Sequence, residues 1–136
     1  MLHKRQKKVY TFERDQAVVE ICRLNPYSKE LFENKAIELK AGDVFSEIKR
    51  FSDNTFDRII HDPPTFKYSP ELYSEKFYAE LYRVLKKHGK MYHYAPLVHK
   101  MKGKNFPARI MKHLKSAGFQ KVFYNERASG IVAMKF

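Results

Sequence analysis

Two hydrophobic periods alternate along this chain, and their order restricts the folds that it can adopt. Short segments rich in β-branched and aromatic residues indicate strands, at residues 9–13, 36–40, 56–61, 90–94, 121–124 and 131–135. Apolar residues at helical spacing indicate helices that begin near Asp15, Ser74 and Pro107. Strands that alternate with helices and end in a hairpin predict an α/β fold with a mostly parallel sheet.

Local signals predict where the first helix begins and ends. Asp15 is a suitable N-cap, and the residue before Pro26 avoids the helical region, so the helix should lie between them. Its apolar stripe is expected to be Val18, Ile21 and Cys22, with Cys22 buried and inert.

The other two helices show comparable signals. The second should span residues 74–88, with Gly89 as a left-handed stop. Its expected apolar face consists of Phe77, Leu81, Val84 and Leu85. The third should start at Pro107 and stop at Gly118, because proline suits the first helical position and glycine the residue after the last.

Composition bounds the class of protein. The 136 residues fit one domain over 1–136, and 43% hydrophobic with 15% aromatic residues argues against a disordered chain. No apolar stretch reaches the roughly 20 residues that span a bilayer, and residues 1–8 are not a secretory signal. A single cysteine, Cys22, excludes an internal disulfide and a cysteine-built zinc site, so we expect a cytoplasmic protein without a membrane partner.

Acidic residues are few, and three of them follow predicted strands. Glu13, Asp43 and Asp62 each lie at or just past a strand end, in a chain with 27 Lys and Arg against 15 Asp and Glu and a net charge of +12. Ligands of open α/β sheets bind at the carboxyl ends of strands, where carboxylates accept hydrogen bonds from ribose hydroxyls. The alternative is that these acids cap helices or are merely solvated.

The Asp62-Pro63-Pro64 segment is the most informative of the three. Two prolines fix the backbone without N–H donors and leave carbonyl oxygens that accept hydrogen bonds. Together with the carboxylate they form a rigid group of acceptors that suits an amine nucleophile. A plain proline turn after a strand is the alternative.

The segment 56–64, Phe-Asp-Arg-Ile-Ile-His-Asp-Pro-Pro, resembles the fourth motif of class I, Rossmann-like S-adenosylmethionine-dependent methyltransferases. Residues 72–78 and 80–90 resemble the helix and turn that lead into the fifth strand of these enzymes, and Tyr92-His93-Tyr94 resembles that strand in a group of uncharacterised archaeal members. The resemblance covers nearly the whole chain and implies a Rossmann-like three-layer sandwich that ends in an antiparallel hairpin.

The resemblance assigns cofactor-binding roles to three residues. It implies that Glu13 accepts from the ribose hydroxyls of S-adenosylmethionine, that Asp43 accepts from the adenine amine and that Val44 lies near the adenine ring.

It also assigns the catalytic segment. Asp62 with the carbonyls of Pro63 and Pro64 would orient a nitrogen nucleophile toward the sulfonium methyl. Nucleic-acid members usually place an aromatic residue directly after the prolines, to stack on the target base. Here Thr65 occupies that position and Phe66 follows, so Phe66 is the candidate for substrate binding and base methylation is a weaker expectation.

The glycine-rich first motif of the family is missing. The five glycines stand at 42, 89, 103, 118 and 130, and none precedes the second predicted strand. In the family the first strand lies between those that end here at Glu13 and Asp62. Without it these two strands should pair directly or expose edges, and a separate polypeptide could supply the missing strand. The chain is therefore expected to be the C-terminal part of a methyltransferase.

Basic residues crowd the second half and make RNA a candidate partner. They are Lys86, Lys87, Lys90, Lys100, Lys102, Lys104, Arg109, Lys112 and Lys115, with Tyr92, Tyr94 and Phe106 among them. A solvated lysine-rich surface is the alternative. The six histidines show no metal-site spacing; His61 is either a proton relay beside Asp62 or a hydrogen-bonded strand-end residue.

The sequence thus favours methyl transfer to a nitrogen nucleophile, with RNA as one candidate substrate. Two alternatives stay open. The first is a non-catalytic Rossmann-like module that binds nucleic acid or protein, and the second is an inactive truncated product.

Overall fold

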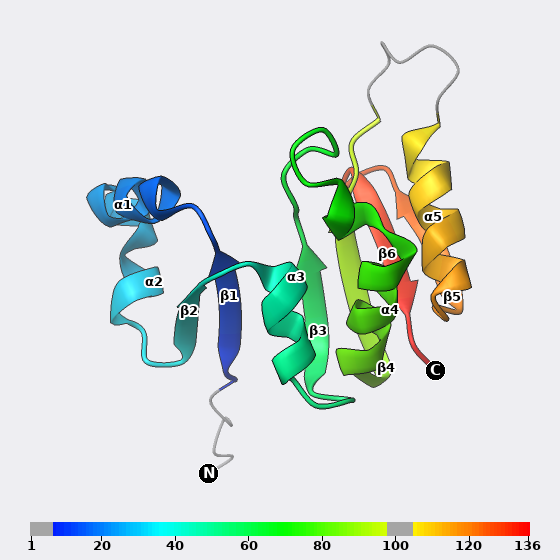
Figure 1. Cartoon of the computed structure of the whole chain (residues 1–136), viewed down its shortest axis with the longest axis horizontal. Helices are drawn as coiled ribbons and strands as arrows, with labels where there is room; N and C mark the ends of the chain where they lie inside the picture. Colours follow the sequence, from blue (N-terminus) through cyan, green and yellow to red (C-terminus); the bar gives the residue numbers. More distant parts are fainter. Residues whose placement is uncertain (1–6, 98–104) are drawn as a thin grey trace. The chain divides into compact units, whose positions relative to one another are not determined.

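The strands form a two-stranded and a four-stranded sheet in the residues that the computed structural model describes, 7–97 and 105–136. The sheets belong to two units, residues 1–47 and 48–136 (Figure 1). The α/β class and the terminal antiparallel hairpin are confirmed. Of the four strand pairings in the described residues, two are parallel and two are antiparallel, whereas we expected a mostly parallel sheet. One domain over residues 1–136 stays a prediction.

The first unit is a parallel pair of strands with short helices. Its strands are β1 (Val9–Glu13) and β2 (Ile37–Ala41), and the register places Glu13 opposite Ala41. Its helices are α1 (Gln16–Leu24), the 3-10 helix η1 (Pro26–Ser28), α2 (Lys29–Glu33) and α3 (Val44–Glu47). The sequence indicated only the first of these helices.

Helix α1 begins and ends where the sequence predicts but buries a different face. The Asp15 carboxylate accepts from the backbone N–H of Ala17 at 2.9 Å, which confirms the cap. The predicted stripe is wrong, because Val19 is buried whereas Ile21 is 66% exposed. Cys22, expected to be buried, is half-buried. Which side of a short helix is covered depends on tertiary packing, which the period alone does not fix.

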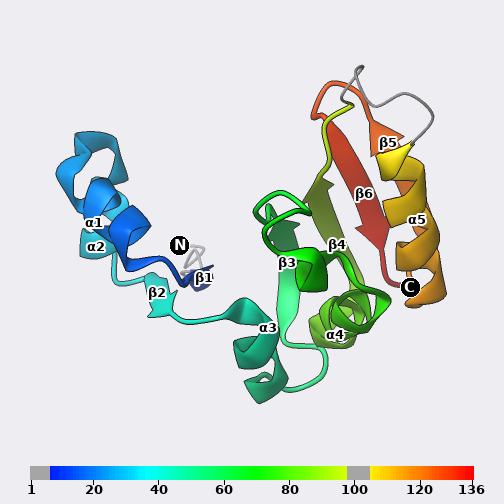
Figure 2. The same cartoon turned by 45° about the horizontal axis from the view of Figure 1, so that its top comes forward.

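The second unit has the strand order β3-β4-β6-β5, with β3 parallel to β4 and the other pairs antiparallel. Its elements are η2 (Ile48–Arg50), β3 (Phe56–His61), η3 (Pro70–Tyr73), α4 (Glu75–Val84), β4 (Leu85–Tyr94), α5 (Phe106–Ser116), β5 (Lys121–Asn125) and β6 (Gly130–Met134). Helices α4 and α5 lie on the same face of the sheet (Figure 2). The core lies between these helices and the sheet, and its fully buried residues include Phe77, Tyr78, Leu114 and Ile131.

The third helix starts and stops as predicted. Asn105 caps α5 by accepting from Ala108 N–H at 3.1 Å, and Pro107 lies in its first turn. Gly118 has φ +119°, the left-handed conformation that the prediction required.

The predicted end of α4 is wrong. The helix stops at Val84, and β4 begins at Leu85, which pairs with Phe56 of β3. Gly89 lies inside β4, and the residue with positive φ is His88, at 63°. A Cβ on Gly89 would lie 2.7 Å from the Leu85 side chain, so this glycine allows close packing. The helical pattern continues past residue 84, but pairing with a distant strand prevails.

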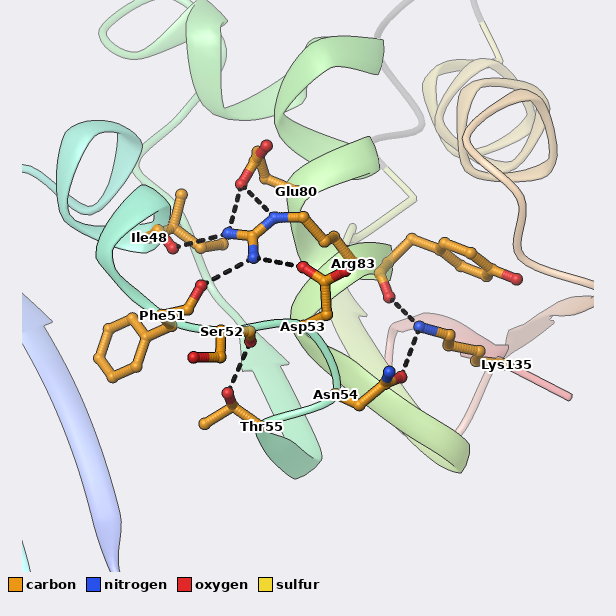
Figure 3. Close-up of polar contacts among 10 residues, drawn as sticks. Ile48, Phe51, Ser52, Asp53, Asn54, Thr55, Glu80, Arg83 and Lys135 are labelled. Carbon is orange, nitrogen blue, oxygen red and sulfur yellow. Dashed lines mark hydrogen bonds and ion pairs between the residues drawn. The ribbon is translucent and has the colours of Figure 1, made fainter.

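The connection that leads into β3 is held by Arg83 of α4 (Figure 3). Its guanidinium donates to the carbonyls of Ile48 and Phe51 at 3.1 and 2.7 Å, and to the carboxylates of Glu80 and Asp53 at 2.7 and 2.9 Å. A planar cation with several N–H donors can satisfy carbonyls and carboxylates together. Arg83 therefore fixes the turn from which β3 starts.

Candidate active site

The Asp62-Pro63-Pro64 segment follows β3 directly. Strand β3 ends at His61, which pairs with His93 of β4. The prolines cannot extend the ladder because they lack N–H groups. The chain then passes through a loop and η3 into α4, whose N-cap Ser74 accepts from Phe77 N–H at 3.1 Å.

Two long-range hydrogen bonds close this loop back onto the end of β3. The Nε2 atom of His61 lies 2.9 Å from the carbonyl oxygen of Leu72, and the hydroxyl of Tyr73 donates to the carbonyl of Pro64 at 2.8 Å. A carbonyl only accepts, so His61 must carry its proton on Nε2. Together the two bonds fix the loop that carries Asp62.

His61 is an anchor in this structure. Its side chain is buried, and burial with the neighbouring His93 lowers the pKa of His61 to about 3. The imidazole is therefore neutral at neutral pH and donates to Leu72. Of the two interpretations offered by the sequence, the geometry supports the hydrogen-bonded strand-end residue and not the proton relay.

His93 is a second buried imidazole, stacked edge-on against His61 at 4.6 Å between ring centroids. Its Nδ1 lies 2.9 Å from the carbonyl of Tyr94, so Nδ1 carries the proton and Nε2 accepts from the Tyr78 hydroxyl, also at 2.9 Å. Burial lowers the pKa of His93 to about 4 and raises the pKa of Tyr78. The ends of β3 and β4 thus rest on two buried, neutral imidazoles, of which His93 has both ring nitrogens hydrogen-bonded.

Asp62 itself is exposed, and its charge acts on two phenols of this unit. Burial raises the pKa of Tyr73 to about 12, with a further contribution from the Asp62 carboxylate. Burial raises the pKa of Tyr92 as well, again with Asp62 contributing. Both phenols therefore keep their protons at neutral pH, and the carboxylate is the anionic acceptor at this end of the sheet.

Phe66 lies in a turn in which the N–H groups of Tyr68 and Ser69 donate to the carbonyl of Thr65. Its ring is 47% exposed. Its centroid lies 5.6 Å from that of Tyr73 and 5.8 Å from that of Phe106, the first residue of α5. Neighbouring rings therefore fix an aromatic face close to the proline segment.

Glu13, Asp43 and Val44 lie in the first unit. The parallel β1 and β2 end together, and Gly42 N–H donates to the Glu13 carbonyl at 3.3 Å, so Glu13 and Asp43 share one sheet edge. The Glu13 carboxylate accepts from Asp15 N–H at 2.9 Å, and that of Asp43 accepts from Phe45 N–H at 3.0 Å. Each acid therefore already makes a turn contact, as the capping alternative expected, and Val44 begins α3.

Carboxylate acceptors at adjoining strand ends match the hydroxyl and amine donors of a nucleoside, so this set of acceptors fits part of S-adenosylmethionine. Residues 7–41 contain no glycine, so within the described chain no glycine-rich turn precedes β2. The predicted residues thus form two groups. Glu13, Asp43 and Val44 belong to one unit, and Asp62, Pro63, Pro64 and Phe66 belong to the other.

The sequence did not indicate Tyr73, Tyr78 and His93 as parts of the site, and it indicated Phe106 only as an aromatic of the candidate RNA-binding stretch. Tyr78 and His93 fall in ordinary helix and strand patterns, and Tyr73 and Phe106 lie just before expected helices. The hydrogen bonds of Tyr73 and His93 join residues 9 and 15 positions apart in the chain. The strand register His61↔His93 is the signal that could have found the imidazole pair.

Among the predicted basic residues, Lys100, Lys102 and Lys104 lie outside the described residues. Lys86 pairs with the exposed Asp57 at 3.2 Å, so it is engaged within the sheet. Lys87, Lys90, Arg109, Lys112 and Lys115 are exposed. No described group of three or more His, Cys, Asp or Glu side chains is placed to hold a metal ion, and no described helix is long and apolar enough to cross a membrane.

Solved structures share this architecture. A spermidine synthase in complex with the transition-state analogue AdoDATO superposes with a TM-score of 0.74 at 19% identity, over 93% of this chain and 45% of that one. A Methanococcus maripaludis protein assigned to the S-adenosyl-L-methionine-dependent methyltransferases gives 0.61 at 20% identity, over 94% of this chain and 67% of that one. The fold is that of the Rossmann-like methyltransferases.

The family follows from the sequence match. The chain belongs to the spermine/spermidine synthase domain family, whose model matches residues 1–125. The uncharacterized protein MJ1233 of the archaeon Methanocaldococcus jannaschii is 42% identical over 134 residues, which are 98% of this chain and 46% of the relative. The chain thus spans about half the length of this relative.

Proposed function

We propose that this chain carries the nucleophile-orienting part of an S-adenosylmethionine-dependent methyltransferase site that methylates a nitrogen atom. The observation that carries the proposal is the clamped loop: Asp62 is exposed, while the hydrogen bonds of His61 and Tyr73 fix the backbone on either side. A fixed acceptor reduces the entropy lost when a nucleophile is aligned with its electrophile.

The carboxylate and the two proline carbonyls have different roles in this proposal. The Asp62 carboxylate accepts an N–H of the nucleophile and takes up the proton that the nitrogen loses on alkylation. The Pro63 carbonyl accepts a second N–H, while the Pro64 carbonyl is held by the Tyr73 hydroxyl. When bound, S-adenosylmethionine would supply the electrophilic methyl group.

Glu13, Asp43 and Val44 are the proposed nucleoside-binding residues. Glu13→Ala and Asp43→Ala should each weaken S-adenosylmethionine binding at least about tenfold, the loss of a charge-assisted hydrogen bond. Titration calorimetry of the 136-residue chain measures this effect. Glu33→Ala on α2, which removes only a surface pair with Lys29, should leave binding unchanged. A folded wild-type chain that gives no heat at millimolar cofactor would show that it does not bind cofactor alone.

RNA is the proposed substrate because of the exposed basic residues of β4 and α5 and the exposed ring of Phe66. The test uses methyl-labelled S-adenosylmethionine with unmodified RNA transcripts. Label transfer should require Asp62 and fall in Asp62→Asn, with Asp57→Asn on exposed β3 as the matched control. RNA binding that ignores Asp62→Asn and transfers no label would indicate the non-catalytic binding module.

A second candidate follows from the family match, which concerns a synthase of polyamines. In that reaction an amine substrate would occupy the same Asp62 acceptor and receive an aminopropyl group from decarboxylated S-adenosylmethionine. Incubation with putrescine and either cofactor, followed by mass spectrometry, separates the two candidates by the added mass.

A further inference from the structure

The turn between β5 and β6 lies at the same end of the four-stranded sheet as Asp62 (Figure 1). Strand β3 runs parallel to β4 and β6 runs antiparallel to it, so β6 begins at the end where β3 and β4 finish. The last register row, from Tyr94 of β4 to Asn125 of β5, lies level with Asp62. The turn at residues 126–129 extends past this row and contains Arg127.

Hydrogen bonds from β4 and the residue after it hold this turn in place. The N–H of Ala95, directly after β4, donates to the Ser129 carbonyl at 3.1 Å. The hydroxyl of Tyr92, within β4, donates to the Ala128 carbonyl. The two bonds accept at adjacent carbonyls of the turn, so the backbone that carries Arg127 is fixed against β4.

Tyr92 connects the turn to Asp62. A Cβ on Gly130 would lie 2.5 Å from the Tyr92 ring, so the glycine leaves the space through which this ring reaches the turn. Burial raises the pKa of Tyr92, and the charge of Asp62 contributes to the same shift, so the carboxylate lies within electrostatic reach of the phenol. The hydroxyl that Asp62 influences is the one that donates to Ala128. Asp62 and the β5–β6 turn therefore border the same end of the sheet.

Arg127 is an exposed cation on this turn. Among the residues that the structure describes, its guanidinium has no hydrogen-bond or ion-pair partner, whereas that of Arg83 binds two carbonyls and two carboxylates. The neighbouring Glu126 is exposed as well. Lys67 is the cation of the loop after β3, and its Nζ lies 5.8 Å from the centroid of the Tyr68 ring. The guanidinium of Arg127 is thus available to an anionic ligand, with one carboxylate beside it.

A guanidinium at this position discriminates between substrates by their charge. Its planar set of N–H donors matches phosphate oxygens, and its charge repels ammonium groups. In the order β3-β4-β6-β5, the turn lies two to three strand spacings from β3, about 10 to 14 Å across the sheet. A substrate that contacts both Asp62 and Arg127 therefore extends well beyond its reacting nitrogen. A nucleotide chain, with a phosphate on either side of each base, fits this arrangement, whereas a polyamine, cationic at each nitrogen, does not.

We propose that Arg127 binds a phosphate of a single-stranded RNA that lies across this end of the sheet, next to the base that Asp62 and Phe66 receive. The assignment of that base rests on the proposed function, and the phosphate is a second contact of the same substrate. Lys67 adds a positive charge on the loop after β3, whereas Glu126 opposes an anion at Arg127 and limits the affinity.

The test measures binding of a fluorescein-labelled single-stranded oligoribonucleotide of random sequence by anisotropy, over a series of KCl concentrations. Arg127→Gln should weaken binding about fivefold or more at low salt and lower the slope of log Kd against log salt by about 0.7, because one phosphate contact is lost. Glu126→Gln should tighten binding, because it removes a repelling charge. Lys121→Gln removes one positive charge from the same hairpin and is the matched control. Lys121 begins β5, about 13 Å before Asn125 and beyond the Debye length of about 10 Å at 0.1 M salt, so its loss should change neither quantity.

Methyl transfer to RNA, measured on the same variants, separates this assignment from the proposed function. Label transfer that is lost in Asp62→Asn but unchanged in Arg127→Gln would overturn the assignment and leave the proposed function in place. RNA binding that depends on Arg127 without any label transfer would contradict the proposed function and support the phosphate contact. The assignment is also overturned if wild type binds no RNA at low salt, if Arg127→Gln and Lys121→Gln bind equally, or if wild type alkylates putrescine. Because the Arg127 side chain is exposed, Arg127→Gln should keep the midpoint of thermal unfolding of wild type, which excludes a folding defect as the cause of weaker binding.

Discussion

The two units contain the same kinds of elements but bury very different amounts of apolar surface. In the first unit Val19 is the one buried apolar side chain among the described residues, and Leu24 and Tyr27 are 85% and 94% exposed. In the second unit both α4 and α5 bury an apolar face against the sheet. A two-stranded sheet with short helices is marginal on its own, whereas a four-stranded sheet covered by two helices forms a core.

The difference bears on function because the proposed roles are divided between the units. The nucleophile-orienting loop belongs to the unit with the core and is clamped by hydrogen bonds between distant residues. Glu13 and Asp43 belong to the thinly packed unit and make only local turn contacts. Cofactor binding should therefore depend on added apolar cover more strongly than the folding of the second unit does.

The largest expected difference between the units is in how far a drop in pH lowers their stability. His61 and His93 have folded-state pKa values of about 3 and about 4, below the ordinary 6.5, so the unfolded chain binds more protons between these values. Stability is full above pH 6.5 and falls as the pH drops below it, by about 1.4 kcal/mol per pH unit for each histidine. Urea unfolding of the second unit at pH 7, 6 and 5 should show this loss. The described part of the first unit contains no histidine.

Two variants sharpen the acid experiment. His93→Gln removes one of the two buried imidazoles, so the pH slope should roughly halve although the stability at pH 7 is lower. His113→Gln changes a partly exposed histidine of α5 that contacts Glu75 at 3.8 Å, and the slope should persist. An unchanged slope in His93→Gln would contradict the assignment of part of the pH dependence to the buried His93.

The fold was largely predictable because its strands and caps have local signals. The strands at 9–13 and 56–61 match in full, and Asp15 and Pro107 mark real helix starts. The end of α4 was not predictable, because the pairing of Phe56 with Leu85 overrides a continuing helical pattern. The buried face of α1 was missed for the same reason, since tertiary packing decides which side is covered.

Within the loop after β3, the sequence could predict only the exposed polar segment Asp62-Pro63-Pro64. Asp62-Pro63-Pro64 stands out because prolines after a strand are a backbone signal. The support beneath it, in which Tyr73 reaches back to Pro64 and His93 lies against His61, depends on chain closure and strand register. No local pattern reports either contact.

A matched pair of core variants compares the units directly. Val84 of the second unit is fully buried and Val19 of the first is 5% exposed. Val84→Ala should reduce the free energy of unfolding by about 2–3 kcal/mol, because two buried methyl groups are lost and a cavity remains. Val19→Ala should cost less, about 1 kcal/mol, because its thinner surroundings can relax. Denaturant unfolding measures both free energies. Equal losses would contradict the conclusion that the second unit is packed more tightly than the first.

Tyr73→Phe tests the clamp within the well-packed unit. It removes one hydrogen bond to the Pro64 carbonyl and keeps the ring contacts, so stability should fall by about 1 kcal/mol. Hydrogen exchange should quicken at the Tyr68 and Ser69 amides of the loop, while the amides of β6 stay protected. Tyr68→Phe, at a ring 70% exposed, is the control. Unchanged exchange in the loop of Tyr73→Phe would show that His61 alone holds it.

The smallest effect is expected on the exposed side of α1. Ile21 is 66% exposed, so Ile21→Lys removes little buried apolar surface and should change the free energy of unfolding by less than about 0.5 kcal/mol. A lysine also suits the later part of a helix, where the dipole favours positive charge. Thermal unfolding of Ile21→Lys beside Val19→Ala measures the difference between the two sides of the helix. A loss in Ile21→Lys as large as in Val19→Ala would mean that the first unit buries Ile21 in solution, and the contrast between the two units would narrow accordingly.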